Sequence, residues 1–542
     1  MSLPSSSQNM PGMLHSDGSP TSISRSSFSS TFSQSSRSSP LQSFSSLALS
    51  PLSNGISPQH LQMMMMMGPQ ATQASSISPS TFPPHQLHHL QNHNMNWVQE
   101  LKSEERGLLI IQLLLKCAGS VSANHMEYTN YLLEQLSLLT SFNGDPIQRV
   151  ASHFMEGLAA RMMKSWPGLY KALSCPHLPS SSELVSCRQL FFLLCPYLKF
   201  AFTLVNHSIL EAMEREKVVH IIDLGASEAI QWITMLQMLS TRAGGPPHLR
   251  ITIINDRKEV LEKIGQELSE KAESLDIPFQ FHPVVAKLED VRIEMLRVKT
   301  GEAVAVSAVL RLHCLLMNED FEGGSGNNIS ATMQNSAGAM LGDLQERERS
   351  LREFFEKEGS VVRHVYRQDS ASDATGVVAQ GPLSGFSKAD GLLRMLRGIS
   401  PKVMVIMEGE ASMNGGGFMD RFVEALHYYG AIFDSLEGSL PGKFASERLT
   451  LERHMFGRAI GNIVSCEGSE RVERQERLPR WIKRLQLAGF VQAPLSYASL
   501  IQVKRILASY TVTEGYKLVE SNGCLTVCWQ DTPLFSASAW QA

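Results

Sequence analysis

The sequence has no excess of basic residues. Its 48 lysines and arginines stand against 52 aspartates and glutamates, which leaves a formal net charge of −4. Proteins that bind nucleic acid or membrane surfaces without further specificity are usually basic, so this balance argues against both classes. Helix-turn-helix, zinc-finger and basic-zipper signatures are also missing, and we therefore expect any contact with DNA to be indirect.

A cysteine framework, a signal peptide and a membrane span are missing as well. The eight cysteines follow no regular spacing, which is typical of reduced thiols inside a cell. The start of the chain has no charged segment followed by an apolar one. The longest apolar segment, 190–205, contains Pro196 and Lys199 and is too short to span a bilayer. We expect a soluble protein of the cytoplasm or nucleus.

Residues 1–96 have almost no lysine or acidic residues and no helical or strand periodicity. They are rich in serine, proline, glutamine and methionine. Such a segment cannot bury enough apolar surface to offset the entropy that ordering would cost. We predict that it is a disordered tail and that folded structure begins near Trp97.

Residues 97–186 read as a leucine-rich helical cap. Residues 101–118 are broadly apolar, and a second helix is indicated by the helical spacing of Tyr128, Leu132, Leu136 and Leu139. A third helix opens with Asp145 as N-cap, Pro146 in its first turn and Gln148 placed for a capping box. The cap is either a packed helical core or a surface that binds other proteins, and both readings stay open.

From residue 187 onward the pattern changes to strands that alternate with helices. Helices over 187–216 precede five apolar strands, and this order predicts a parallel sheet. Asn522-Gly523 is a strong hairpin signal between two further strands, and a last strand follows at 534–540. The layout is that of class I methyltransferases, a Rossmann-like α/β fold with antiparallel C-terminal strands. The five expected parallel strands are 218–224, 249–255, 279–285, 302–310 and 402–408.

Two stretches interrupt this pattern. Residues 319–395 are rich in glycine, serine and charge, and we predict a flexible surface insertion. Residues 467–484 alternate glutamate and arginine around Trp481. That stretch is either an ion-pair docking face or a solvated helix with pairs three and four residues apart, and the solvated helix is the favoured reading.

Several motifs resemble those of the plant GRAS family. His220-Ile221-Ile222-Asp223 is similar to the VHIID signature, and Arg421-Phe422 and Tyr428-Tyr429 lie where a PFYRE region would be. Trp481 and Gly489 have the W-x7-G spacing, and Trp529 and Trp540 have the W-x10-W spacing of a SAW ending. The resemblance divides the ordered chain into the cap, a VHIID core at 187–318, the insertion, a PFYRE region at 396–464 and a SAW region at 465–542.

The resemblance implies a nuclear transcriptional co-regulator that acts through contacts with DELLA-type proteins and zinc-finger DNA-binding factors. It further implies roles in gibberellin signalling and root development, and pairing with itself or another family member. The tryptophans can equally be core anchors, which is the commoner case for this residue. The motif residues taken as candidates for partner binding are His220, Ile221, Ile222, Asp223, Arg421, Tyr429, Trp481, Gly489, Trp529 and Trp540.

The strand-end crevice has lost features that a methyl-donor site needs. The turn after the first strand has one glycine, Gly225, and Asn255 stands where an acidic residue would hold the ribose. Glu228 near a helix start would compete with an anionic ligand. We therefore assign no catalytic, cofactor-binding or metal-binding residue and expect no enzyme. The alternatives are an S-adenosylmethionine-dependent methyltransferase and a non-catalytic small-molecule receptor.

Overall fold

The computed structural model describes residues 101–169, 181–317, 387–415, 417–440, 442–510 and 515–542. The tail predicted at 1–96 lies outside the described residues, and so does most of the insertion predicted at 319–395. The seven cysteines within the described residues are free thiols.

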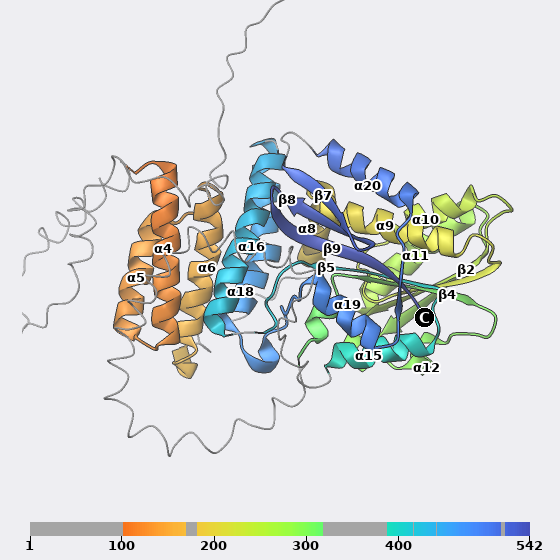
Figure 1. The fold of residues 1–542 in the computed structure, drawn as a ribbon, viewed down its shortest axis with the longest axis horizontal. Helices are drawn as coiled ribbons and strands as arrows, with labels where there is room; N and C mark the ends of the chain where they lie inside the picture. Colours follow the sequence, from red (N-terminus) through yellow and green to blue (C-terminus); the bar gives the residue numbers. More distant parts are fainter. Residues whose placement is uncertain (1–100, 170–180, 318–386, 416, 441, 511–514) are drawn as a thin grey trace, which may run out of the picture. The chain divides into compact units, whose positions relative to one another are not determined.

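Three helices form the cap, and they lie side by side in Figure 1. The third begins as the sequence predicts: the Asp145 carboxylate accepts the Gln148 amide N–H at 2.9 Å, and the Gln148 side chain accepts the Asp145 amide N–H at 3.2 Å. This reciprocal pair satisfies two amide groups that the start of a helix leaves open. The cap helices are α4 (Ser103–Ser122), α5 (Met126–Leu139) and α6 (Pro146–Met163).

Two further helices connect the cap to the sheet, namely α8 (Ser181–Leu194) and α9 (Pro196–Ala212). Pro196 lacks an amide N–H and begins a new helix after Cys195. In the described part of the chain no single helix is long and apolar enough to cross a membrane. Ser186–Leu194 and Pro196–Ala212 meet that criterion only as a pair, and the pair is bent by 84°.

The sheet has the order β3-β2-β1-β4-β5-β9-β8-β7, and the short strand β6 pairs with β9. The first five strands are parallel, and the strands from β9 onward are antiparallel, which confirms the predicted fold class. Asn522 and Gly523 turn the β7–β8 hairpin with φ of 50° and 71°. The strands are β1 (Val218–Asp223), β2 (His248–Asn255), β3 (Phe279–Val285), β4 (Ala303–Val309), β5 (Val403–Gly409), β6 (Val491–Ala493), β7 (Tyr516–Ser521), β8 (Cys524–Trp529) and β9 (Thr532–Gln541).

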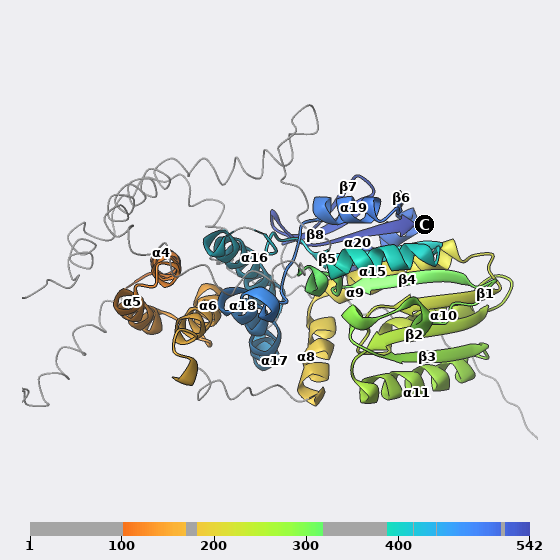
Figure 2. The same ribbon diagram turned by 90° about the horizontal axis from the view of Figure 1, so that it is seen from below.

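Helices cover both faces of the sheet and give it two separate cores, as Figure 2 shows. Alternate residues of β1 enter different cores: Ile221 belongs to the larger one, and Ile222 to the smaller. The larger core is formed with α9, α10 (Ile230–Ser240), α11 (Lys258–Ser274), α16 (Phe418–Ser439), α20 (Tyr497–Ser509) and the cap. The smaller core is formed with α12 (Ile293–Leu296), α15 (Lys388–Gly398) and α19 (Leu478–Leu487).

The structure corrects two predictions. Helix α15 begins within the predicted insertion at 319–395 and is part of the fold: a capping box of Ser387 and Asp390 starts it, and Leu393 and Leu396 are fully buried. Within the solvated helix predicted at 467–484, only residues 478–484 are α-helical, as the first part of α19, and several of the charged side chains before them are buried. The sequence analysis also assigned no structure to a long helical segment, which consists of α17 (Ala445–Leu451), a π-helix (Glu452–Phe456) and α18 (Gly457–Ser465).

Candidate functional site

The turn after β1 is held by one carboxylate. Asp223 is buried, and its Oδ1 accepts the amide N–H groups of Gly225 and Ala226, each at 2.8 Å. Its Oδ2 accepts the indole N–H of Trp232 at 2.9 Å. Burial raises the pKa of Asp223, and these hydrogen bonds oppose the rise. The carboxylate therefore serves the turn and the start of α10.

The space beside this turn is filled by the protein. The Arg311 side chain lies against Gly225 so closely that a Cβ added there would overlap Nε of Arg311. The Asn255 side chain donates to the carbonyl of Ala226 at 3.1 Å and accepts the amide N–H of Arg257 at 3.0 Å. A methyl donor of the kind this fold family holds needs the same space. These residues do not fit S-adenosylmethionine, and we derive no methyl transfer.

Four buried polar atoms near the strand ends have no hydrogen-bond partner among the described residues. They are Ser227 Oγ, Glu228 Oε1, Ser307 Oγ and Arg311 Nε. Ser307 pairs in register with Asp223 across β4 and β1, so this atom lies deep at the same edge. Buried polar atoms normally find a partner, in the protein or in ordered water. Side chains thus bury this edge of the sheet, but four of its polar atoms have no hydrogen-bond partner among the described residues.

A buried histidine joins β4, β5 and the segment before α19. His313 Nδ1 lies 2.6 Å from Glu408 Oε2, and His313 Nε2 lies 3.5 Å from Glu473. The other oxygen of Glu408 accepts the amide N–H groups of Arg311 and Leu312. Burial alone would lower the pKa of His313, but its interactions with the neighbouring Cys314 and with the Glu408 carboxylate outweigh burial and hold that pKa well above its usual value. This cluster is an ion-paired clamp.

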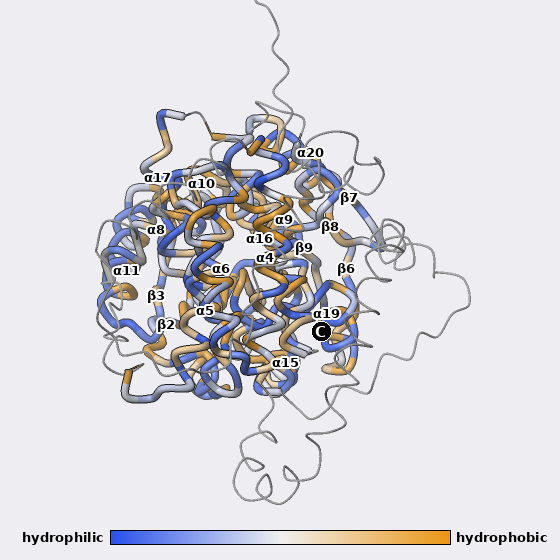
Figure 3. Tube along the Cα trace, turned by 90° about the vertical axis from the view of Figure 1, so that its left-hand side faces the viewer, coloured by the Kyte–Doolittle hydropathy of each residue, from blue (hydrophilic) through white to orange (hydrophobic). Residues whose placement is uncertain are grey.

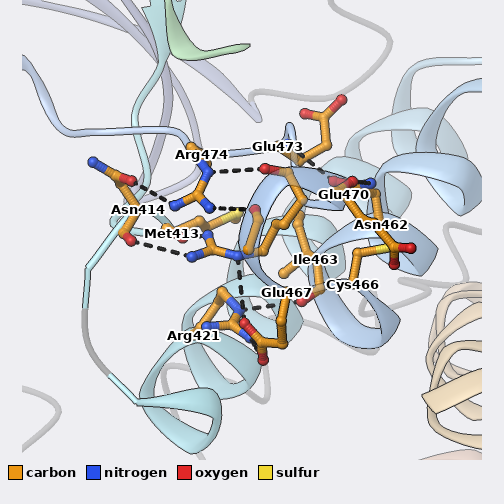
Figure 4. A network of polar contacts seen from close by, with 12 residues as sticks. Met413, Asn414, Arg421, Asn462, Ile463, Cys466, Glu467, Glu470, Glu473 and Arg474 are labelled. Atoms are coloured by element: carbon orange, nitrogen blue, oxygen red, sulfur yellow. Dashed lines mark hydrogen bonds and ion pairs between the residues drawn. The ribbon is translucent and has the colours of Figure 1, made fainter. Parts of the chain in front are cut away.

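We call residues 467–477 the arginine strap; Figure 4 shows its contacts. Arg471 donates to the carbonyl of Met413 at 2.7 Å, and Arg474 donates to its own strap at the carbonyl of Arg471 at 2.8 Å. Asn462 of α18 accepts two amide N–H groups of the strap. These contacts explain why the predicted solvated helix is wrong. The arginines of the strap donate to backbone carbonyls and pair with carboxylates. The strap is therefore extended and partly buried.

The end of the strap is fixed to α15 by a buried three-residue network. Arg484 Nε donates to Glu476 at 2.7 Å, and its NH1 donates to Asp390 at 2.8 Å. Hydrogen bonds from Arg484 and its positive charge lower the pKa of both carboxylates against the effect of burial. Arg484 therefore ties the SAW-type helix α19, which carries Trp481, to α15.

The cap is fixed to the rest of the domain by buried charge. Arg149 of α6 lies 3.0 Å from Glu452, and both side chains are 1% exposed. Glu452 opens the π-helix that precedes α18, and π-helical turns are frequently found at functional sites. Arg161 of α6 pairs with Glu467 of the strap at 2.8 Å and lies 4.0 Å above the ring of Phe418. These pairs fix how the cap sits on α16 and α18.

Nine of the ten candidate motif residues lie in the interior. His220 bonds to Thr252 at 2.7 Å, Trp529 donates to Asp434 at 2.7 Å, and Trp540 donates to Ser538 at 2.9 Å. Gly489 is exposed and takes φ of 92°, a conformation that favours glycine. The structure does not bring the ten residues together on one surface. The buried nine are His220, Ile221, Ile222, Asp223, Arg421, Tyr429, Trp481, Trp529 and Trp540.

An apolar surface that the motifs do not mark lies on helix α5. Figure 3 views the protein from the cap side, where α5 and α6 are nearest. The inner face of α5 is formed by Thr129, Leu132, Leu136 and Leu139, all buried. The helix predicted from the spacing of Tyr128, Leu132, Leu136 and Leu139 is confirmed, and of these four residues Tyr128 is the exposed one, at 46%.

The outer face of α5 follows helical spacing of its own. Tyr128 stacks with Tyr131 at 6.4 Å between ring centroids, and Leu138, two further turns along, is 39% exposed. Gln135 lies between them at the same spacing. We call Tyr128, Tyr131, Gln135 and Leu138 the α5 outer face. Tyr131 is half-buried against the larger core and Gln135 is polar, so Tyr128 and Leu138 are the two exposed apolar residues of this face.

Among the described residues no group of three or more histidines, cysteines, aspartates and glutamates is placed to hold a metal ion. The fold and the sites define the class of protein: a three-layer α/β scaffold of methyltransferase type with a helical cap and a strand-end crevice filled by its own side chains. The comparisons with known proteins narrow this class.

The GRAS domain family matches residues 110–541. Scarecrow-like protein 3 of Arabidopsis thaliana is 45% identical over 82% of this chain and 91% of its own length. Chitin-inducible gibberellin-responsive protein 1 of Oryza sativa is 33% identical over 81% of this chain and 66% of its own length. Scarecrow-like transcription factor PAT1 of Arabidopsis thaliana is 32% identical over 79% of this chain and 75% of its own.

Among solved structures, the crystal structure of SCL7 from Oryza sativa superposes with a TM-score of 0.59 at 27% identity. The superposition covers 80% of this chain and 99% of the SCL7 chain. The chain belongs to the GRAS family, which confirms the resemblance drawn from the motifs.

Proposed function

We propose that the protein is a nuclear transcriptional co-regulator that acts by holding other regulatory proteins. The names of its relatives, a transcription factor and a gibberellin-responsive protein among them, support this role and a place in gibberellin signalling. The family resemblance supports DELLA-type proteins and zinc-finger DNA-binding factors as partners, with DNA reached through them, and a role in root development.

The observation that carries the proposal is the contrast between a filled crevice and an open apolar helix face. Exposed apolar residues in helical register on an outer helix favour protein contact. The α5 outer face offers such residues, with Tyr128 46% and Leu138 39% exposed. The motif residues then act as the framework that holds the cap in place rather than as contact residues.

The test is capture of DNA-binding partners by the full-length protein. A double variant, Tyr128→Ser with Leu138→Ser, should reduce co-precipitation of zinc-finger and DELLA-type proteins at least about tenfold, because a few anchors such as tyrosine carry most of the binding energy in such interfaces. The matched control replaces the same residue types on α20 and α19, as Tyr497→Ser with Leu487→Ser, which are 76% and 66% exposed. Undiminished capture by the cap variant, with loss in the control, would contradict the assignment to the cap.

A second candidate, a non-catalytic small-molecule receptor, is favoured by the unpartnered polar atoms at the strand ends. Arg311 Nε and Glu228 Oε1 would suit a small ligand with both an acceptor and a donor. A ligand screen by thermal shift, repeated on Arg311→Ala, tests it. A stabilising compound whose effect disappears in the variant supports the receptor, and S-adenosylmethionine belongs in the same screen as a check on the enzymatic alternative.

A further inference from the structure

The inference concerns Arg188 and Arg311 at the carboxyl ends of the strands, and it rests on the receptor that the proposed function gives as its second candidate. Arg188 lies on α8, and Arg311 follows β4. Both residues are half-buried, and within the described residues neither guanidinium forms an ion pair or a hydrogen bond. A charge that is partly removed from water is costly unless it is paired. The two guanidiniums therefore favour an anion as a partner.

The two guanidiniums also act on each other. Burial lowers the pKa of Arg188, and the positive charge of Arg311 lowers it further. Like charges that are held near each other in a partly buried place repel more strongly than they do in water. An anion that contacts both guanidiniums would remove this repulsion, so the pair favours one shared anionic group over two separate ones.

The carboxylates near the arginines are engaged elsewhere or lie beyond ion-pair distance. Both oxygens of Asp223 accept hydrogen bonds, from the turn and from Trp232. Glu408 accepts two amide N–H groups and contacts His313. Glu228, which the sequence predicts to compete with an anion, forms no ion pair with either arginine in the described part of the chain, and burial raises its pKa. The carboxylates of the described residues therefore leave both guanidiniums unpaired.

Two hydroxyl groups lie at the same edge of the sheet. Ser307 is 1% exposed, Ser227 belongs to the turn after β1, and neither Oγ has a hydrogen-bond partner among the described residues. On β4, Ser307 shares its face with Ala305 and Val309 of the larger core, to which α8 also contributes. The Ser307 hydroxyl therefore lies on the side of the sheet that α8 covers.

The kinds of donor indicate which anion fits. A guanidinium forms paired hydrogen bonds with phosphate oxygens, and a serine hydroxyl donates a further one. Donors from α8, from the turn after β1 and from β4 suit the tetrahedral oxygens of a phosphate group better than the planar oxygens of a carboxylate. Glu228 Oε1 is an acceptor without a partner among the described residues, and it suits a hydroxyl group on the molecule that carries the phosphate.

We propose that this edge of the sheet binds the phosphate group of a small phosphorylated polyol. Arg188 and Arg311 hold the phosphate. Ser227 and Ser307 donate to its remaining oxygens, and Glu228 accepts a hydroxyl group of the polyol. A phosphate group needs less room than S-adenosylmethionine. The Arg311 side chain, which no hydrogen bond within the described residues fixes against the turn, moves toward the phosphate.

Compounds with one carbon skeleton test the proposal on the full-length protein. Glucose 6-phosphate carries a phosphate, gluconate carries a carboxylate, and glucose carries neither. In isothermal titration calorimetry at constant ionic strength, glucose 6-phosphate should bind at least about tenfold tighter than gluconate, and glucose should not bind. Phosphoserine, which represents a phosphorylated protein, should also bind at least about tenfold more weakly than glucose 6-phosphate. Equal binding by gluconate would overturn the phosphate, and equal binding by phosphoserine would overturn the polyol.

Arg188→Met with Arg311→Met separates the site from general charge attraction. This variant should lose at least about tenfold in affinity for glucose 6-phosphate. It should also unfold at a higher urea concentration than wild type, because two unpaired charges are removed from a partly buried place. The matched control, Arg453→Met with Arg505→Met, removes two exposed arginines and should leave both values unchanged. A lower urea midpoint for the first variant, or an equal loss of affinity in the control, would overturn the proposal.

Carboxylates of the chain itself are the rival occupant. Glu319, Asp320 and Glu322 follow Arg311 closely in the sequence and lie outside the described residues. Glu319→Gln with Asp320→Asn and Glu322→Gln should leave the affinity for glucose 6-phosphate unchanged. If glucose 6-phosphate binds to this triple variant and not to wild type, the chain's own carboxylates occupy the arginines, and the proposal is wrong.

Failure of the proposal can be told apart from failure of the proposed function. If another compound stabilises wild type but not Arg311→Ala, while glucose 6-phosphate does not bind, the receptor stands and the phosphorylated polyol is wrong. If glucose 6-phosphate binds as expected while Tyr128→Ser with Leu138→Ser leaves partner capture unchanged, the phosphate site stands and the assignment of partner binding to the cap fails.

Discussion

The carboxyl edge of the sheet and the outer face of the cap differ in what they leave exposed. Side chains of the protein fill the sheet edge, whereas apolar side chains of the cap face solvent. At the sheet edge, Arg311 and Asn255 occupy the space that a methyl donor would need. Both carboxylate oxygens of Asp223 accept hydrogen bonds, one from the turn and the other from Trp232. On α5, apolar side chains that could have been polar are left facing solvent. The strand-end edge is therefore closed by the protein's own side chains, whereas helix α5 leaves apolar side chains exposed.

The same contrast appears in how charge is used. Within the domain, arginines are buried and paired, as in Arg149 with Glu452 and Arg484 with Asp390. On the outer cap, Glu127 and Glu134 have no basic residue in the neighbouring sequence. Buried pairs fix geometry, whereas exposed charges contribute little to the stability of the fold. The predictions below test this division, starting with the largest expected effect.

The buried pair between cap and domain should be the most sensitive. Arg149→Met leaves Glu452 buried with only the more distant Arg448, at 3.8 Å, and burial already raises the pKa of Glu452 despite Arg149. We expect urea denaturation to show a loss of about 3–5 kcal/mol. Arg149→Met with Glu452→Leu should recover most of it, because no charge is then left unpaired. The exposed pair is the control: Lys517→Met should cost at most about 1 kcal/mol. Equal losses in both would mean that burial of the pair does not matter.

Asp434 provides a test through pH. It is 1% exposed, and burial raises its pKa to about 6 although Trp529 donates to it. A carboxyl whose folded pKa is raised contributes most below its unfolded pKa, and that contribution is lost as pH rises through about 6. Asp434→Asn keeps an acceptor for Trp529 and removes the charge. Relative to wild type, it should gain up to about 3 kcal/mol at pH 8 and nothing at pH 4. A constant difference across that range would show that Asp434 does not titrate.

The filled crevice predicts strain at Gly225. Gly225→Ala should cost about 1–3 kcal/mol in urea denaturation, because the added Cβ overlaps Arg311. Arg311→Ala in the same background should recover much of the loss. Gly391 of α15 has nothing within 4 Å of an added Cβ, so Gly391→Ala should instead stabilise by about 0.5–1 kcal/mol. A silent Gly225→Ala would mean that Arg311 does not occupy the crevice.

Much of the fold was predictable because its signals are local. The start of α6 is indicated by Asp145, Pro146 and Gln148, which meet the hydrogen-bonding needs of a helix N-terminus. The hairpin is indicated by Asn522-Gly523, which adopt the positive φ that its turn requires. The apolar strands of a covered parallel sheet are likewise recognisable from composition. The motif at 220–223 then identified the family.

The strap and the outer face were harder because their properties depend on distant partners. The run around Arg471 and Arg474 looks like a solvated helix until Met413 and Asn414 are known to face it. Tyr128 has the same helical spacing as the buried leucines of α5, so spacing alone does not show that it is exposed. No local sequence pattern indicates that Arg311 lies against Gly225, since 86 residues separate the two positions along the chain.

The smallest effect is expected on the α5 outer face itself, and it decides whether that face is a surface or a part of the core. Tyr128→Ser with Leu138→Ser should change the free energy of unfolding by at most about 1 kcal/mol, because exposed substitutions away from buried networks usually stay small. Leu132→Ser with Leu136→Ser, on the inner face of the same helix, should cost at least about 5 kcal/mol, since two fully buried leucines become cavities with hydroxyls. Urea denaturation of both pairs measures the difference directly. A large loss in the outer pair would mean that Tyr128 and Leu138 support the fold, and the cap would then present no spare apolar surface to a partner.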